Sequence, residues 1–147
     1  MRTKKPLLAA AGFALALTLA LAGCDLLGLS GPSGPGELHA TVVSPHSSLD
    51  GAVVLELSNV GSIGYVRSDH GQVFYQDNGN TTRVVVVLDD PGLITFFLRV
   101  DEVADLPEVT FIQVADAMNE LRPTVSDYDL SWDQIADSDR EFSRRAQ

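Results

Sequence analysis

Oxygen-bearing side chains gather in two turn-like stretches, where they could bind a cation. The stretch YQDNGNTT offers Asp77, Asn78 and Asn80, and LDDPG offers Asp89 and Asp90. Ca²⁺ prefers carboxylate and amide oxygens in tight loops, and the two stretches could meet if successive hairpin ends lie together. Their spacing does not follow the D-x-[DN]-x-[DN]-G pattern, and ordinary turn chemistry explains both stretches. These residues stay candidate metal ligands, and no cofactor is predicted.

The three histidines are the candidates for acid–base chemistry. His39 and His70 lie among serines and acids, and His46 lies in the turn-like SPHSSLDG. A hydrolase needs a nucleophile within hydrogen-bond reach of a base and a third group that orients the base. Without a G-x-S-x-G or other nucleophile motif, we interpret the histidines as surface or strand-end residues and predict no catalytic residue. Convergence of His39, His70 and a carboxylate in one pocket would favour an enzyme instead.

Aromatic residues could form a platform that stacks on sugar rings. The candidates are Tyr65, Phe74, Tyr75, Phe96 and Phe97. Neighbouring residues of a strand point to opposite faces, so one ring of each adjacent pair is expected to leave the core unless both faces are covered. The alternative is that these rings fill the core of a small domain.

The elements that would position these residues are β-strands, because apolar residues recur with a period of two. Val53, Leu55 and Leu57 share one face of GAVVLELSN, and Tyr128, Leu130 and Trp132 share one face of DYDLSW. Trp132 is therefore expected to pack inward. The predicted strands are LHATVVS, GAVVLELSN, IGYVR, QVFYQ, TTRVVVVLDD, LITFFLRV, EVTFIQVA and DYDLSW. About eight short strands predict an all-β fold, a small antiparallel sandwich of two sheets.

Turn signals separate these strands. Asn78-Gly79 predicts a tight hairpin, and Asp90-Pro91-Gly92 and Leu106-Pro107 predict further turns. Beyond Trp132 the chain becomes charged and loses its alternation, which predicts a frayed or short helical tail. We expect the sandwich over residues 37–133 and a polar tail over 134–147.

The N-terminus has the pattern of an export signal. Arg2, Lys4 and Lys5 precede an apolar run that is free of charge and ends on small residues before the only cysteine of the chain. Leu21-Ala22-Gly23-Cys24 resembles the lipobox of bacterial lipoproteins. The resemblance implies cleavage between Gly23 and Cys24 and diacylglycerol on Cys24, so residues 1–23 would be a signal peptide. An ordinary signal or a membrane helix is the alternative.

Lipidation would also explain the lone cysteine, which can form no internal disulfide in an oxidising compartment. Acyl chains such as palmitate on Cys24 would hold the protein at the membrane, with the domain on the extracytoplasmic side. The following residues, rich in Gly, Ser and Pro, predict a flexible tether to residue 36. Asp25 resembles a signal that retains lipoproteins in the inner membrane of enteric bacteria.

The charge of the mature chain excludes several partners. After residue 23 it has seven arginines and no lysine against 20 acidic residues, a net charge of −13. Nucleic acids and anionic lipid surfaces require positive charge at the contact, so we expect neither as a partner. Solubility beside a negative membrane explains this acidity more simply than a specific cationic ligand.

The order of the strands and turns, with VTFIQVADAMNELRP and a closing YDLSW, resembles the second half of cohesin-type sandwiches and small envelope lipoproteins built on that half. The resemblance covers residues 37–133 and implies an Ig-like or cohesin-like fold that binds a partner through one sheet face, but it carries over no site residue. The expected function is that of a non-catalytic interaction or structural module whose partner is an envelope protein or glycan. The alternative is a small hydrolytic or metal-dependent envelope enzyme.

Overall fold

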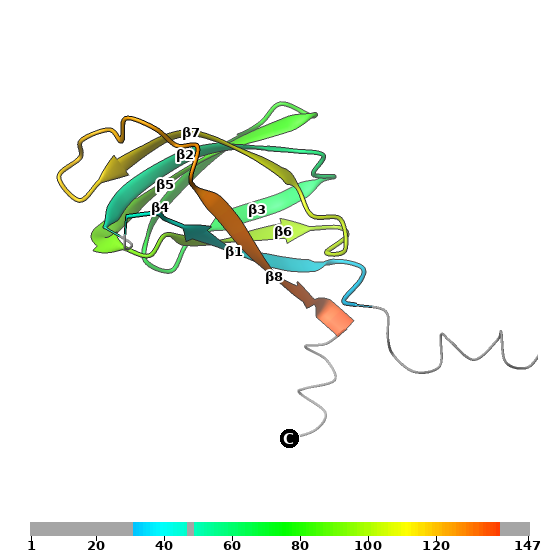
Figure 1. The fold of residues 1–147 in the computed structure, drawn as a ribbon. Helices are drawn as coiled ribbons and strands as arrows, with labels where there is room; N and C mark the ends of the chain where they lie inside the picture. The colour runs from blue at the N-terminus through cyan, green and yellow to red at the C-terminus, as the bar shows by residue number, and fades with distance from the viewer. Residues whose placement is uncertain (1–30, 47–48, 139–147) are drawn as a thin grey trace, which may run out of the picture. The chain divides into compact units, whose positions relative to one another are not determined.

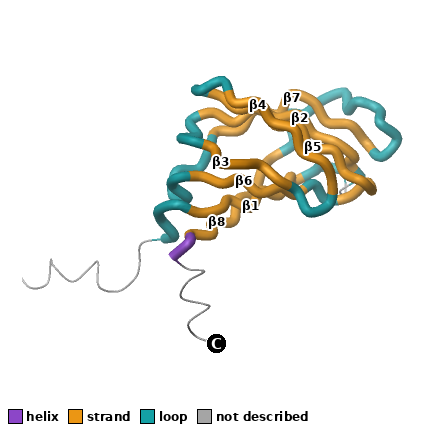
Figure 2. Tube along the Cα trace, turned by 180° about the vertical axis from the view of Figure 1, so that it is seen from behind, coloured by secondary structure: helices purple, strands orange, loops and turns teal. Residues whose placement is uncertain are grey.

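A computed structural model describes residues 31–46 and 49–138, which form two four-stranded antiparallel sheets packed face to face (Figures 1 and 2). The strands are β1 (Gly36–Val43), β2 (Asp50–Ser58), β3 (Ile63–Arg67), β4 (Gly71–Asp77), β5 (Thr81–Gly92), β6 (Thr95–Val100), β7 (Glu108–Asp116) and β8 (Asp129–Ala136). Sheet A has the order β3-β6-β1-β8, and sheet B has the order β4-β5-β2-β7. The predicted all-β sandwich is confirmed.

The predicted signal peptide, Cys24 and the first part of the predicted tether lie outside the described residues. In residues 31–46 and 49–138, no helix is long and apolar enough to cross a membrane.

The alternation of the sequence builds the core between the sheets. Val53, Leu55 and Leu57 of β2 are all buried. Phe96 of β6 lies edge-on against Trp132 of β8, with ring centroids 6.2 Å apart, so Trp132 packs inward as predicted. The other buried apolar residues are Leu38, Ala40, Val42, Val66, Val84, Val86, Leu88, Ile94, Leu98, Val100, Val103, Val114, Tyr128, Leu130 and Ala136.

The hairpin between β4 and β5 has the predicted position but a different turn. Asn78 N–H donates to Thr81 O at 2.9 Å, so Gly79 and Asn80 are the two central residues. Gly79 has a φ of 87°, whereas Asn78 does not have a positive φ. Glycine at the first central position is typical of a two-residue hairpin turn, so the expected Asn78-Gly79 centre is wrong by one residue.

Two strand ends also differ from the prediction. A turn was expected at residues 90–92, but these residues belong to β5, which continues to Gly92 before the chain crosses to sheet A. The pairing of β5 with β2 shifts in register between Asp50 and Ala52. The predicted tail begins too early, because β8 continues to Ala136. β8 pairs with β1 up to Ala136 without a shift in register, and Gln134 Nε2 donates to Val103 O at 2.8 Å.

The entry of the chain into the domain is tightly held. Pro35 O accepts a hydrogen bond from Asp137 N–H, and Gly34 O accepts one from Val103 N–H, both at 3.0 Å. At Gly36 a Cβ atom would lie 2.3 Å from Ile135 O, so only glycine allows this approach of β1 to β8. Residues 34–36, which were predicted to belong to the flexible tether, are therefore part of the folded domain. β1 lies in the middle of sheet A, paired with β6 on one side and β8 on the other.

Candidate functional site

A pocket of about 630 Å³ lies where the end of β5 meets the outer face of sheet A. The segments that form it are β1, the β3–β4 connection, the end of β5 and the region from Gly92 into β6. Its lining residues are His39, Asp69, His70, Leu88, Asp89, Asp90, Gly92, Leu93, Thr95 and Phe97. The described lining thus combines three carboxylates and two histidines with apolar side chains, and it includes no arginine or lysine.

One wall of the pocket is formed by His39 and Phe97, which belong to a row of side chains in register across sheet A. Phe97 of β6 lies opposite Arg67 of β3 and His39 of β1, and His39 lies opposite Asp133 of β8. The His39 and Phe97 rings stack with centroids 4.5 Å apart and an interplanar angle of 8°. The Arg67 guanidinium carbon lies 3.9 Å from the centroid of Phe97, within the range of a cation–π contact. Strand register therefore fixes this wall.

A buried carboxylate supports the same wall. Glu37 is only 2% exposed, and its Oε1 accepts hydrogen bonds from the Tyr65 hydroxyl and, at 3.4 Å, from Arg67 Nη2. The hydrogen bond to Glu37 raises the pKa of Tyr65, because it favours the protonated phenol. Arg67 Nη1 donates to Asp69 Oδ1 at 2.7 Å, which links the buried Glu37 to the rim of the pocket.

The pocket brings together His39, His70 and carboxylates, which the sequence analysis did not expect. By the criterion stated from the sequence, this convergence favours an enzyme. The hydrolase arrangement also needs a nucleophile beside the base. Among the described residues, Ser68 lies near His70, but its Oγ accepts from the backbone N–H of His70 and not from the ring. The nearest charged contact of His39 is Asp133 Oδ2, 3.8 Å from Nδ1, which is too long for a hydrogen bond. The described lining thus places two imidazoles and three carboxylates around one space.

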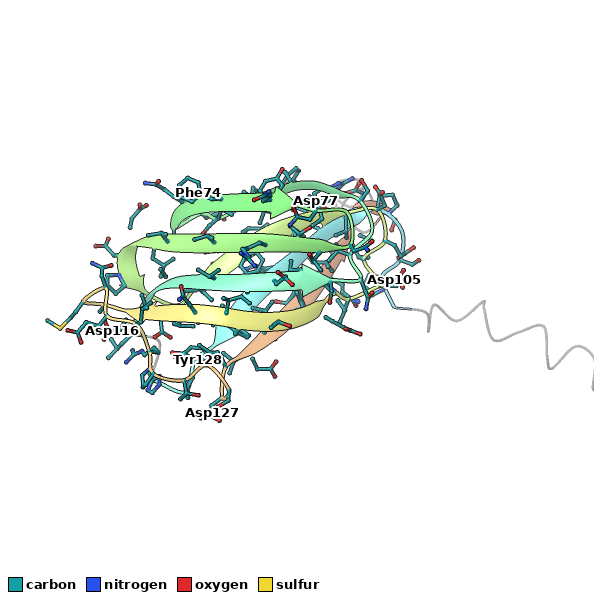
Figure 3. The ribbon with its side chains drawn as sticks, turned by 90° about the horizontal axis from the view of Figure 1, so that it is seen from above. Phe74, Asp77, Asp105, Asp116, Asp127 and Tyr128 are labelled. Carbon is teal, nitrogen blue, oxygen red and sulfur yellow. The ribbon has the colours of Figure 1, made fainter. Side chains whose placement is uncertain are left out.

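The predicted calcium ligands do not come together. Asp77, Asn78 and Asn80 lie at the β4–β5 hairpin, whereas Asp89 and Asp90 lie at the other end of β5, about 23 Å away along the strand. Figure 3 shows Asp77 with Asp105 at one end of the sandwich, opposite Asp116. The expectation that the two stretches meet is therefore wrong. Across residues 31–46 and 49–138, no group of three or more acidic, histidine or cysteine side chains could hold a metal ion.

The aromatic candidates are divided among three positions. Phe96 is buried, while its neighbour Phe97 is on the outer face in the stack with His39, so the expected split of this pair is confirmed. Tyr65 bonds to Glu37. Phe74 and Tyr75 are both exposed on the edge strand β4, away from the pocket. Among the described residues these rings do not form one continuous platform, because Phe96 is buried and Phe74 and Tyr75 lie on a different sheet from Phe97.

A second buried carboxylate, which the sequence analysis missed, lies at the end of sheet B. Asp50 is 1% exposed, and its Oδ1 accepts hydrogen bonds from Arg122 Nε at 3.1 Å, Arg122 Nη2 at 3.0 Å and the Tyr128 hydroxyl at 3.1 Å. Burial raises the pKa of Tyr128. His46 lies beside this cluster, with its ring 6.0 Å from that of Tyr128, and does not reach the pocket. These contacts close the end of the sandwich around Tyr128 (Figure 3).

Sequence signals for Glu37 and Asp50 exist but are faint. Each is an acid at the start of an otherwise apolar strand, Glu37 in GELHATVV and Asp50 in DGAVVLELS. Their partners lie 28 to 78 residues away in the chain, so only the fold reveals the pairs.

Comparison of the chain with protein-family models, with curated proteins and with solved structures finds no match. The function must therefore be inferred from the residues of this chain.

Proposed function

We propose that this protein is lipid-anchored in the cell envelope and binds, without catalysis, a cationic group of a protein or glycan partner in the pocket beside His39. The pocket charge supports this proposal. Asp69, Asp89 and Asp90 line the pocket, and no lysine or arginine is among its described lining residues. Arg67, beside Phe97, is already paired with Asp69 and the buried Glu37, so Asp89 and Asp90 favour a positive group in the pocket. Asp89 and Asp90 form no ion pair with any of the four arginines in the described part of the chain.

The walls of the pocket suit a binding role. In the stack of Arg67, Phe97 and His39, hydrogen bonds to Glu37 and Asp69 hold Arg67 beside Phe97, which favours a pre-formed wall. A pre-formed wall lowers the entropy lost on binding. Leu88 and Leu93 add apolar surface against which the carbon atoms of a ligand could pack.

The proposed anchor rests on Leu21-Ala22-Gly23-Cys24 and the apolar run before it. Metabolic labelling with palmitate tests it in cells that produce the protein. We expect label on the wild-type chain and none on Cys24→Ala, which should also leave the membrane fraction. Label that persists on Cys24→Ala would remove the anchor from the proposal.

Cross-linking capture from the envelope fraction tests the pocket, with the full mature chain in detergent as bait. We expect one saturable partner, a protein or glycan with exposed amino or guanidinium groups. The double variant Asp89→Asn/Asp90→Asn should lose most of this capture. The double variant Asp77→Asn/Asp105→Asn removes the same charge at the other end of the sandwich and should capture normally. Equal capture by both variants would contradict binding in the pocket.

A hydrolytic enzyme is the second candidate, because His39 and His70 line the same pocket as three aspartates. A screen of the purified chain with chromogenic ester, amide and glycoside substrates tests it. We expect no turnover that depends on either histidine. Turnover that disappears in both His39→Gln and His70→Gln would favour the enzyme over the binding module.

A further inference from the structure

The strand β4 differs from the other three sheet edges of the described fold. The edge strands are β3 and β8 in sheet A and β4 and β7 in sheet B. An exposed edge offers unpaired N–H and C=O groups to any other strand, and proteins usually block it by short length, charge, proline or a bulge. The state of each edge therefore indicates whether a further strand can add to it.

Three of the edges carry such blocks. β3 has only five residues, and its pairing with β6 is irregular between Ile63 and Val66. β7 has a bulge beside Ile112, and Arg122 N–H already bonds to Val114 O on its outer side. β8 presents the acids Asp129 and Asp133, which would oppose like charges of a neighbour.

β4 carries none of these blocks. It pairs with β5 over seven residues without a shift in register, and GQVFYQD has no proline and no charge before its last residue. Phe74 is 59% exposed on this strand. In a mature chain with a net charge of −13, this is a regular, neutral and partly apolar edge.

The backbone of β4 is oriented for a further antiparallel strand. Asn78 N–H bonds to Thr81 O, and hydrogen-bonded residues alternate along the strand. The backbone N–H and C=O groups of Phe74 therefore point toward β5, and those of Val73 and Tyr75 point outward. Among the residues that the structure describes, no strand pairs with this outer side.

The side chains of β4 are self-complementary around Phe74. When the strand is placed antiparallel to a second copy, Phe74 opposes Phe74, Val73 opposes Tyr75, and Gln72 opposes Gln76. Val73 and Tyr75 would exchange both backbone hydrogen bonds, and the two Phe74 side chains would form the closer, non-hydrogen-bonded pair. Aromatic and amide cross-strand pairs are favourable, and no like charges face each other in this register.

We propose that two copies of this protein dimerise through β4, in the antiparallel register centred on Phe74, and join their B sheets into one continuous sheet. The contact is isologous, because the same strand serves both copies, and it closes at two subunits. The dimer uses neither the pocket nor the lipid anchor and does not depend on the proposed ligand.

Analytical ultracentrifugation of the full mature chain in detergent, over a range of protein concentrations, tests the proposal. We expect a monomer–dimer equilibrium for the wild type. Phe74→Glu places two carboxylates against each other and should raise the dissociation constant by about 100-fold or more. Ile112→Glu adds the same charge to an exposed residue of the blocked edge β7 and should dimerise like the wild type. Circular dichroism checks that both variants are folded.

Disulfide trapping gives a second measurement that does not need a disruptive variant. In a non-hydrogen-bonded pair the Cα atoms lie about 4.5 Å apart, which a disulfide can span. Phe74→Cys should form a covalent dimer under mild oxidation, whereas the wild type and Ile112→Cys, which share Cys24, should not. A wild type that stays monomeric at every concentration would overturn the proposal. A dimer whose dissociation constant is unchanged by Phe74→Glu, together with no cross-linking of Phe74→Cys, would also overturn it.

Discussion

The two buried carboxylates have similar partners but different positions. Glu37 and Asp50 each bind a tyrosine hydroxyl and an arginine. The partners of Glu37 come from β3, and one of them, Arg67, contacts Phe97 of the pocket. Those of Asp50 come from the segment between β7 and β8, and the group closes the end of the sandwich. A buried carboxylate bonded to tyrosine and arginine therefore supports the candidate site at Glu37, whereas at Asp50 it supports only the fold.

The exposure of the arginines sharpens the difference. Arg122 is 18% exposed and Arg67 is 43% exposed. Loss of the carboxylate would leave Arg122 with less access to water than Arg67, and an uncompensated charge is more costly the less water reaches it. We therefore expect the Asp50 region to dominate stability and the Glu37 region to dominate binding.

Asp50→Ala should have the largest effect on stability. It removes the main partner of Arg122 and Tyr128, and breaking a buried ion pair from one side destabilises a protein by about 3 to 5 kcal/mol. Chemical denaturation followed by tryptophan fluorescence measures the loss. Asp105→Ala, an exposed acid between β6 and β7, is the control and should change the free energy of unfolding little. A similar loss in both variants would contradict the role of the cluster.

Glu37→Gln should have a smaller effect on stability and a larger one on the pocket. The amide still accepts a hydrogen bond, so we expect a loss of about 1 to 3 kcal/mol from the weakened contacts to Tyr65 and Arg67. Partner capture should fall, because Arg67 loses the charge that holds it beside Phe97. Capture that is unchanged in Glu37→Gln would show that the wall does not depend on this carboxylate.

Tyr128→Phe and Tyr65→Phe isolate the hydroxyl of each region. Each variant removes one hydrogen bond, at a loss of about 1 kcal/mol. The folded pKa of both tyrosines is raised above 10.0, so their stabilising effect is complete below pH 10.0 and is lost as the pH rises through the raised pKa. Denaturation at pH 8 and pH 11 should therefore show a smaller difference between wild type and variant at the higher pH.

Asp116→Asn should have the smallest effect. The pKa of Asp116 lies below its ordinary value of 3.8, because its carboxylate accepts hydrogen bonds from the backbone N–H groups of Glu120 and Met118. The stabilisation is present above pH 3.8 and is lost as the pH falls through the lowered pKa. Acid unfolding monitored by circular dichroism should show a weaker pH dependence for Asp116→Asn than for the wild type. Identical acid transitions would exclude this contribution.

The strands were predictable from the sequence because their signal is local. Val53, Leu55 and Leu57 alternate with less buried residues within one strand, and the sandwich follows from such periods. The end of β8 was not predictable, because the inward Gln134 has a polar side chain whose partner, Val103, lies 31 residues away.

The pocket could not be predicted from local sequence patterns. Its lining comes from four segments that are brought together by crossings between the sheets, and the order of strands in each sheet cannot be read from alternation. His39 looks like an ordinary strand residue until the register places Phe97 and Asp133 beside it. The buried Glu37 and Asp50 were missed for the same reason, since an acid at the start of a strand is usually exposed.

The central position of β1 determines when the domain can fold. The first strand of the domain pairs with β6 and with the last strand, β8, so sheet A cannot be completed until almost the entire chain is available. Pairing between such distant segments makes folding slow, because long loops must close before the contacts form. A chain emerging from the ribosome would stay without its native structure until synthesis is nearly finished. For the exported protein that we propose, that delay would keep the polypeptide in the extended state that a narrow translocation channel accepts.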